Sequence, residues 1–153
     1  MLTELTEAIH RGDDDLPFLD TGTGTWLKLC MVDLGAGLWV IRNRFDAGVQ
    51  VQKHKHTGAV FGFTLAGAWK YAEYDYVNRA GSFLFEPAGS EHTLTVPADN
   101  TEQTDVWFAI YGANLNLAAD GSIESITDAA GILAAYRAMA AAAGHPDPDV
   151  VVR

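Results

Sequence analysis

The residues of this chain that could do chemistry are mainly three of its five histidines. His54 and His56 stand two apart in VQKHKHTG, a segment that can be extended, so period-two alternation sends both imidazoles to one face. His92 follows a strand-like segment and a Pro-Ala-Gly turn, from which a third imidazole can approach the first two. Three neutral imidazoles leave two or three positions open on a divalent ion. The pattern predicts one divalent metal held by His54, His56 and His92, whereas His10 and His145, in the terminal segments, are assigned no role.

The segments that must position these histidines are of β type. Between Trp26 and Ile110, short runs rich in Val, Ile, Thr and aromatic residues alternate with glycines, which is typical of an all-β barrel or sandwich. Most of the aromatic side chains are predicted to fill the core, although they could instead line a pocket for an aromatic or diketone substrate. These aromatic residues are Trp26, Trp39, Phe61, Phe63, Trp69, Tyr71, Phe83, Phe85 and Trp107.

The ends of the chain have a different character from the β-type centre. Residues 1–24 are predicted to form a peripheral N-terminal arm that contains a short helix over Thr3–His10, with Thr3 as its N-cap. The alanine-rich segment 127–144 is predicted to be one helix, capped by Thr127 or Asp128, that packs on a barrel formed by residues 25–126. We expect these three parts to form one domain.

Composition and charge limit the function further. The chain has 153 residues and a formal net charge of -10, without a basic cluster, so nucleic acid is not expected as a partner. No stretch approaches the roughly 20 apolar residues of a membrane span, so no membrane partner is expected. The single cysteine, Cys30, cannot form an intrachain disulfide, and the first residues lack the apolar run of a secretory signal. A cytoplasmic location is therefore expected.

Two motifs place the histidines in a wider pattern. The first contains, in order, Gly48, His54, His56 and Gly67. The second contains Gly81, Pro87, Gly89 and His92. In order and spacing they resemble the two motifs of the cupin superfamily. The resemblance implies a single-domain all-β cupin fold, a double-stranded β-helix or jelly-roll barrel, here followed by a C-terminal helix.

The wider sequence resembles one branch of the cupins. Residues 54–97, the later YGANLNLAADGSI and the helix around AAYRAM are similar to 2,4'-dihydroxyacetophenone dioxygenases, and more distantly to acetylacetone dioxygenase. The likeness covers roughly residues 25–142. It implies a non-haem Fe(II) dioxygenase that cleaves a carbon–carbon bond in a small diketone or hydroxyketone. The substrate would lose a proton and chelate iron through two oxygens, with dioxygen beside it.

The chain departs from the cupin pattern at Val60, where the family often has a ligand glutamate. Glu73 is our candidate for a substitute carboxylate, because in an extended strand it would share one face with Trp69 and Tyr71. We therefore expect Glu73 to be a fourth ligand or a base, with Tyr71 as a second catalytic candidate. Glu86 and Asp75 are weaker candidates, and a solvated strand carboxylate is the alternative for Glu73.

Two other functions fit the same residues. One is a zinc-binding sensor or interaction module of the anti-sigma cupin type, and the other is a metal-dependent isomerase. Imidazole ligands suit Zn, Ni and Mn as well as Fe, so Fe(II) is favoured by the resemblance alone. A homodimer is also expected, in which the N-terminal arm or the C-terminal helix packs across a two-fold axis.

Overall fold

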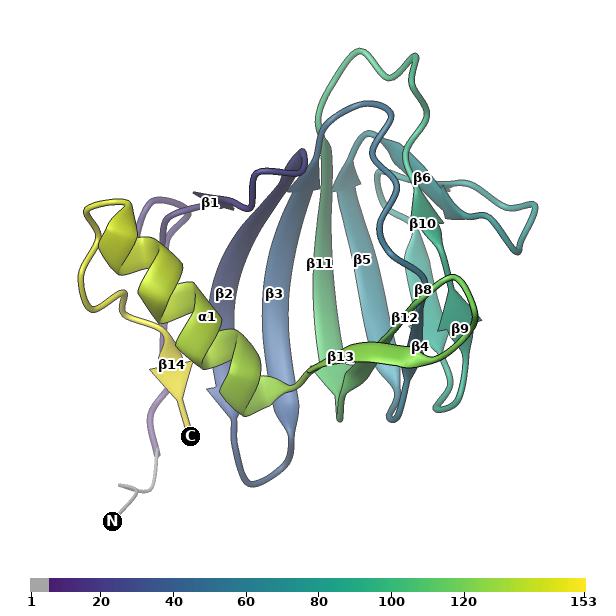
Figure 1. The fold of residues 1–153 in the computed structure, drawn as a ribbon. Coiled ribbons are helices and arrows are strands. Elements are labelled where there is room, and N and C mark those ends of the chain that lie inside the picture. The colour runs from purple at the N-terminus through teal and green to yellow at the C-terminus, as the bar shows by residue number, and fades with distance from the viewer. Residues whose placement is uncertain (1–5) are drawn as a thin grey trace.

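Strands that alternate buried and exposed side chains build most of this protein. The computed structural model describes residues 6–153, which form three sheets and one helix (Figure 1). The strands are β1 (Leu19–Asp20), β2 (Thr25–Asp33), β3 (Leu38–Phe45), β4 (His54–His56), β5 (Val60–Ala66), β6 (Ala68–Tyr71), β7 (Asn78–Arg79), β8 (Phe83–Glu86), β9 (Glu91–His92), β10 (Leu94–Thr95), β11 (Thr104–Tyr111), β12 (Asn114–Leu117), β13 (Ile123–Thr127) and β14 (Val151–Val152). The helix, α1, spans Ala129–Ala142.

The largest sheet has seven strands and forms the curved wall at the centre of Figure 1. Its order is β1-β2-β3-β11-β5-β8, and β14 adds to β2 in parallel. In β3 every second side chain is buried, including Trp39, Ile41 and Phe45. This period of two gives the sheet an inner face that lines the interior and an outer face turned away from it.

Two smaller sheets enclose the interior from the other side. One has the order β13-β12-β4-β9, and the other has the order β10-β6-β7. The core between the sheets is apolar and strongly aromatic, with Trp39, Trp69 and Tyr71 at 2% exposure or less. The strands confirm the predicted all-β architecture.

The C-terminal helix is confirmed as well. Asp128 caps α1 by accepting a hydrogen bond from the backbone N–H of Gly131 at 2.8 Å. The buried face of α1, which includes Leu133 and Tyr136, packs on β2. The Tyr136 hydroxyl donates to the Pro17 carbonyl at 2.6 Å and so ties the helix to the N-terminal segment. No helix among residues 6–153 is long and apolar enough to cross a membrane.

The N-terminal arm differs from its prediction. Residues 6–10 contain no helix, and Thr3, the predicted cap, lies outside the described residues. The arm instead adds the short strand β1 to β2 and places Asp13 against Arg42, at 2.6 Å between carboxylate and guanidinium. Isolated short helices are marginal, and residues 6–10 are exposed, so no packing supports a helix there.

Candidate metal centre

Two of the predicted ligands lie side by side on β4. Its three residues are buried, half-buried and buried in turn, so His54 and His56 face the interior while Lys55 turns away. The two imidazole rings have their centroids 4.7 Å apart in an edge-on arrangement. The Nδ1 of His54 lies 3.0 Å from the Gln52 carbonyl oxygen. A proton on Nδ1 would fix the tautomer that leaves Nε2 as the ligand atom.

His92 reaches the same place from the neighbouring strand. β9 pairs with β4 in antiparallel register, so His92 stands opposite His54. The Pro-Ala-Gly turn before β9 is held against β4 by a hydrogen bond from the Gly89 N–H to the His56 carbonyl, at 2.7 Å. The ring centroids of His56 and His92 lie 5.8 Å apart. The strand pairing thus brings the three predicted histidines onto neighbouring strands, but the ligand atoms of His56 and His92 lie within 4.8 Å of each other and those of His54 do not join that group.

The carboxylate that joins them is that of Glu86. Glu86 ends β8 and pairs directly with Val60 on β5, the position where the cupin pattern often has its glutamate. Both side chains face the interior, at 2% and 1% exposure. Glu86, on the neighbouring strand, therefore supplies a carboxylate next to the position where Val60 replaces the glutamate of the cupin pattern.

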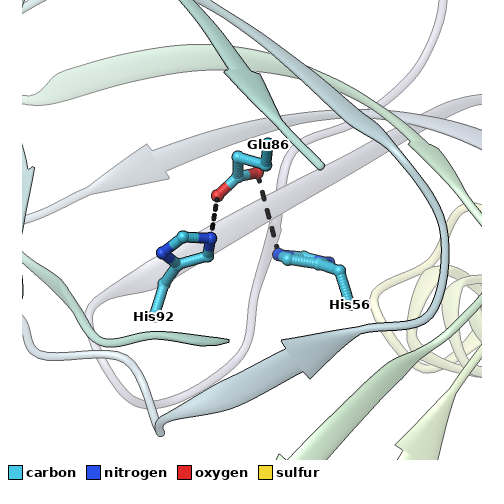
Figure 2. Close-up of side chains that lie close together, drawn as sticks. All are labelled: His56, Glu86 and His92. Carbon is cyan, nitrogen blue, oxygen red and sulfur yellow. Dashed lines mark ion pairs between the residues drawn. The ribbon is translucent and has the colours of Figure 1, made fainter. Parts of the chain in front are cut away.

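Three ligating groups converge on one point, as Figure 2 shows for His56, Glu86 and His92. Glu86 Oε1 lies 3.3 Å from His92 Nε2, and Glu86 Oε2 lies 3.7 Å from His56 Nε2. Their carboxylate oxygens and ring nitrogens are buried, and none has a hydrogen-bond partner within residues 6–153. Atoms that share an ion at about 2.1 Å lie roughly 3.0–3.4 Å apart when their angles are near 90–110°. The 3.3 Å separation lies in this range and the 3.7 Å separation corresponds to a wider angle of roughly 120°. A divalent cation shared by the group would satisfy atoms that are otherwise costly to bury.

The imidazoles are neutral near pH 7, as metal ligands must be. Burial lowers the pKa of His56 to about 3, with further lowering by His54 and His92, against an opposing effect of the Asn114 amide. Burial also lowers the pKa of His92 to about 4 and lowers that of His54. The short contacts to Glu86 are therefore not ion pairs with imidazolium.

Tyr71 lies behind the cluster. Its ring stacks on His92, with 4.2 Å between centroids and 19° between planes. Burial raises the pKa of the Tyr71 hydroxyl well above its usual value, so the hydroxyl keeps its proton. Burial likewise raises the pKa of Glu86 to about 7, against an opposing effect of the Tyr71 hydroxyl. Tyr71 therefore packs on one candidate ligand and acts electrostatically on another.

An interior cavity of about 500 Å³ opens at this cluster. It lies between the large sheet and the strands β4 and β12, and His54, His56, Tyr71 and Glu86 are among its lining residues. Much of the remaining wall is apolar and includes Leu27, Trp39, Ile41, Phe45, Val60, Leu94, Phe108 and Ile110. Its size lies within the range of small-molecule pockets.

Glu73 is not where the strand parity placed it. β6 ends at Tyr71, and Glu73 follows in the turn with an exposed side chain. Its carboxylate oxygens accept hydrogen bonds from the N–H and the hydroxyl of Thr93, at 2.9 and 2.8 Å. The expected inward face is therefore wrong for Glu73, although it is right for Trp69 and Tyr71. A role of Glu73 as ligand or base remains a prediction. Asp75, the other weaker candidate, is also exposed.

Known proteins share this fold. Residues 6–113 match the family model described as the ChrR Cupin-like domain. The chain is 31% identical to a protein of unknown function with a cupin-like fold from Ralstonia eutropha JMP134, over 99% of this chain and 96% of that chain, with a TM-score of 0.87. It is 16% identical to an acetylacetone dioxygenase from Acinetobacter johnsonii, over 91% of this chain and 96% of that chain, with a TM-score of 0.77.

A further similarity is to a chain of the complex of SigE with the anti-sigma ChrR from Rhodobacter sphaeroides. The identity is 19%, the coverage is 65% of this chain and 51% of that chain, and the TM-score is 0.54. At these identities the dioxygenase and the anti-sigma complex show a shared fold alone. No curated protein matches the chain. Together the similarities confirm the cupin fold predicted from the two motifs.

Proposed function

This chain belongs to the family of the ChrR Cupin-like domain, and on that premise we propose that it is a metal-dependent dioxygenase that cleaves a carbon–carbon bond in a small diketone or hydroxyketone. The observation that carries the proposal is the convergence of buried, unpaired ligating atoms of His56, Glu86 and His92 beside a cavity of about 500 Å³. A purely structural cluster would be expected to satisfy its buried polar atoms with one another.

The proposed ligands are the imidazoles of His54, His56 and His92 together with the carboxylate of Glu86. His54 is included because its ring centroid lies 4.7 Å from that of His56 and its Nδ1 faces the Gln52 carbonyl, which leaves Nε2 as the ligand atom, although its nitrogens lie outside the cluster formed by His56, Glu86 and His92. Ferrous iron bound there would supply a redox centre for dioxygen and a Lewis acid for two substrate oxygens. These ligand types suit several divalent metals, so the preference for iron rests on the resemblance to dioxygenases.

The chain itself would bind and orient the substrate. The apolar cavity walls exclude water from a ketone and its apolar substituents. Asn114 also lines the cavity, and its buried Oδ1 has no hydrogen-bond partner within residues 6–153. That oxygen can accept a hydrogen bond from a substrate hydroxyl, which favours a hydroxyketone. The Tyr71 hydroxyl keeps its proton and lowers the pKa of Glu86 against the effect of burial, which favours the carboxylate form that would bind a metal.

Oxygen consumption tests this proposal. Protein loaded anaerobically with Fe(II) should consume dioxygen when given a β-diketone or an aromatic hydroxyketone, and two shorter products should be found by mass spectrometry. His56→Ala should abolish the consumption, whereas His145→Ala, at an exposed histidine outside the cluster, should leave it unchanged. If iron-loaded protein consumes no oxygen with any substrate of either class, the dioxygenase proposal is wrong.

A zinc-binding interaction module is the second candidate. The family model and the likeness to the anti-sigma ChrR complex favour it. The cavity beside the cluster favours the enzyme instead, because a metal that only stabilises a fold needs no adjacent space for a substrate. Protein isolated with zinc and inactive after exchange for iron would support the module. Turnover of a ketone without oxygen consumption would support the third candidate, a metal-dependent isomerase.

A further inference from the structure

Four phenylalanines are exposed together on the outer side of β5 and β8. Phe61 and Phe63 on β5 are 40% and 47% exposed, and Phe83 and Phe85 on β8 are 65% and 52% exposed. They face each other across the ladder as the pairs Phe61–Phe85 and Phe63–Phe83, and the Phe61 ring lies 5.5 Å from that of Phe85. We call these four residues the outer aromatic face. The sequence led us to expect them in the core or lining the pocket, and the structure overturns that expectation.

The strand register that turns Glu86 toward the candidate metal centre also produces this arrangement. Side chains alternate along β8, so turning Glu86 and Leu84 inward turns Phe83 and Phe85 outward. On β5, Val60 is opposite Glu86 and faces the cavity, which sends Phe61 outward. A shift of one residue would bury the phenylalanines and expose the carboxylate. The strand register thus exposes apolar side chains that ordinary hydrophobic patterning would bury.

Other parts of the outer surface are covered within the chain. Phe18 of the N-terminal segment lies over β3, with the guanidinium carbon of Arg44 4.0 Å from its ring centroid, and α1 packs on β2. By contrast, β8 is the end strand of the large sheet and pairs only with β5 among the described strands. A short apolar end strand with free backbone groups is a surface that proteins normally cover.

The size and charge of the outer aromatic face indicate what covers it. Each phenylalanine is about half exposed, so the four contribute on the order of 400 Å² of apolar surface. That is about half of the ~800 Å² that each partner buries in a standard interface. None of the four is charged, while the chain as a whole has a formal net charge of -10. Two copies of this face can therefore approach each other without bringing like charges of these four residues together.

We propose that the outer aromatic face packs against the same face of a second copy of this chain. A two-fold axis would bury the phenylalanines of both copies at the centre of an isologous interface, with the acidic surface left outside it. This placement differs from the expectation that the arm and the helix form the dimer. Both of those elements use contacts within the chain, through Arg11 with Asp149 and through Tyr136 with Pro17.

Sedimentation velocity at micromolar concentration tests this interface. The wild-type chain should sediment as a dimer, and the double variant Phe63→Glu and Phe85→Glu should sediment as a folded monomer with unchanged far-UV circular dichroism. The matched control is Ile123→Glu with Ile126→Glu, at two isoleucines of β13 that are 53% and 61% exposed, and it should remain a dimer.

Three results would overturn the proposal: a monomeric wild-type chain, a phenylalanine variant that stays dimeric, or an isoleucine variant that alone dissociates. If the glutamates prevent folding, Phe63→Ser with Phe85→Ser gives the answer, and a serine variant that dimerises as tightly as wild type would equally refute the proposal. None of these measurements depends on metal or activity, so their outcome is independent of the proposed function.

Discussion

Glu86, His56 and His92 bring a carboxylate and several lone pairs into an interior where their polar atoms have no hydrogen-bond partner among the described residues. Burying an unpaired carboxylate costs free energy, and the raised pKa of Glu86, about 7, has the same physical cause. A divalent cation would offset this free-energy cost, because it attracts the carboxylate and accepts the lone pairs of the imidazole nitrogens. At the residue scale, the same atoms that destabilise the metal-free protein are those that would bind metal.

The first prediction separates the two candidate carboxylates. Glu86→Gln should weaken metal binding strongly and should stabilise the metal-free protein by about 1 to 3 kcal/mol, because a neutral amide replaces a buried charge. Glu73→Gln should leave metal binding near the wild-type level, because the Glu73 side chain is exposed and bonded to Thr93. Isothermal titration with Fe(II) or Zn(II), together with urea unfolding of the chelated proteins, measures both effects. If only the Glu73 variant loses metal, Glu73, the carboxylate predicted from the sequence, is the ligand and Glu86 is not.

The second prediction concerns the histidines. Wild-type protein should hold about one divalent ion per chain, and alanine at His54, His56 or His92 should each lower metal affinity by at least about 100-fold. The reason is that each imidazole supplies a ligand atom that water would have to replace. Elemental analysis after dialysis against metal checks this, with His145→Ala as the control. Full metal content in any two of the three variants would contradict a site built on these histidines.

The histidines could be selected from the sequence, but Glu86 could not be ranked first. Period-two alternation puts His54 and His56 on one face whatever surrounds them, and the structure has them so. In Phe83–Glu86 the same period-two alternation puts the two phenylalanines on one face and Leu84 with Glu86 on the other. Hydrophobicity alone favours burial of the face with the phenylalanines. The pairing of Glu86 with Val60, which faces the interior, shows that Glu86 is on the buried face. The sequence did contain a useful signal. Val60 stands where the cupin pattern often has a glutamate, and the later strand-like segment Phe83–Glu86 ends in a glutamate.

At the scale of elements, the arrangement depends on strand pairing rather than on local propensity. β9 has two residues and β4 has three, yet their pairing places His92 opposite His54. The helix α1 was predictable because its alanine-rich sequence and its Asp128 cap are local signals. The helix expected near the N-terminus is absent from residues 6–10, which are exposed, because so short a segment has no packed face to stabilise it. β14 was not predicted, since two residues carry no periodic pattern.

The third prediction concerns the ion pairs that join β3 to β11. Asp105 accepts hydrogen bonds from Arg42 at 2.7 Å and from Arg44 at 3.1 Å. Burial alone would raise the pKa of Asp105, but these bonds outweigh it and leave the pKa below its usual value. The carboxylate therefore contributes stability above about pH 3.9, its unfolded pKa, and this contribution is lost as the pH falls through the lower folded pKa.

Asp105→Asn should accordingly lower the free energy of unfolding by about 1.5 to 3 kcal/mol at pH 7, because two charged donors lose their acceptor. The difference from wild type should shrink as the solution is acidified below about pH 4. Urea unfolding at several pH values measures this, and Asp99→Asn, at an exposed carboxylate, serves as the control. If the difference in free energy of unfolding between variant and wild type stays constant down to acid pH, Asp105 acts through packing rather than through its charge.

At the scale of the whole molecule, the candidate ligands connect parts of the chain that are far apart in sequence. His56 lies on β4, Glu86 on β8 and His92 on β9, and these strands belong to two different sheets. An ion held by all three would cross-link the large sheet to the sheet that encloses the cavity. Because the unfolded chain does not preform such a site, binding free energy adds to the stability of the folded state.

The last prediction follows from this linkage. With free metal at about 100 times its dissociation constant, the folded state gains about 2.7 kcal/mol. For a chain of 153 residues this should raise the melting temperature by about 5 to 10 °C relative to chelated protein. Differential scanning calorimetry with and without chelator, at one fixed protein concentration, makes the comparison. In His56→Ala the gain should disappear, because the ion loses one ligand and the cross-link between the two sheets weakens. An equal gain in wild type and variant would mean that the metal stabilises the protein from elsewhere on its acidic surface.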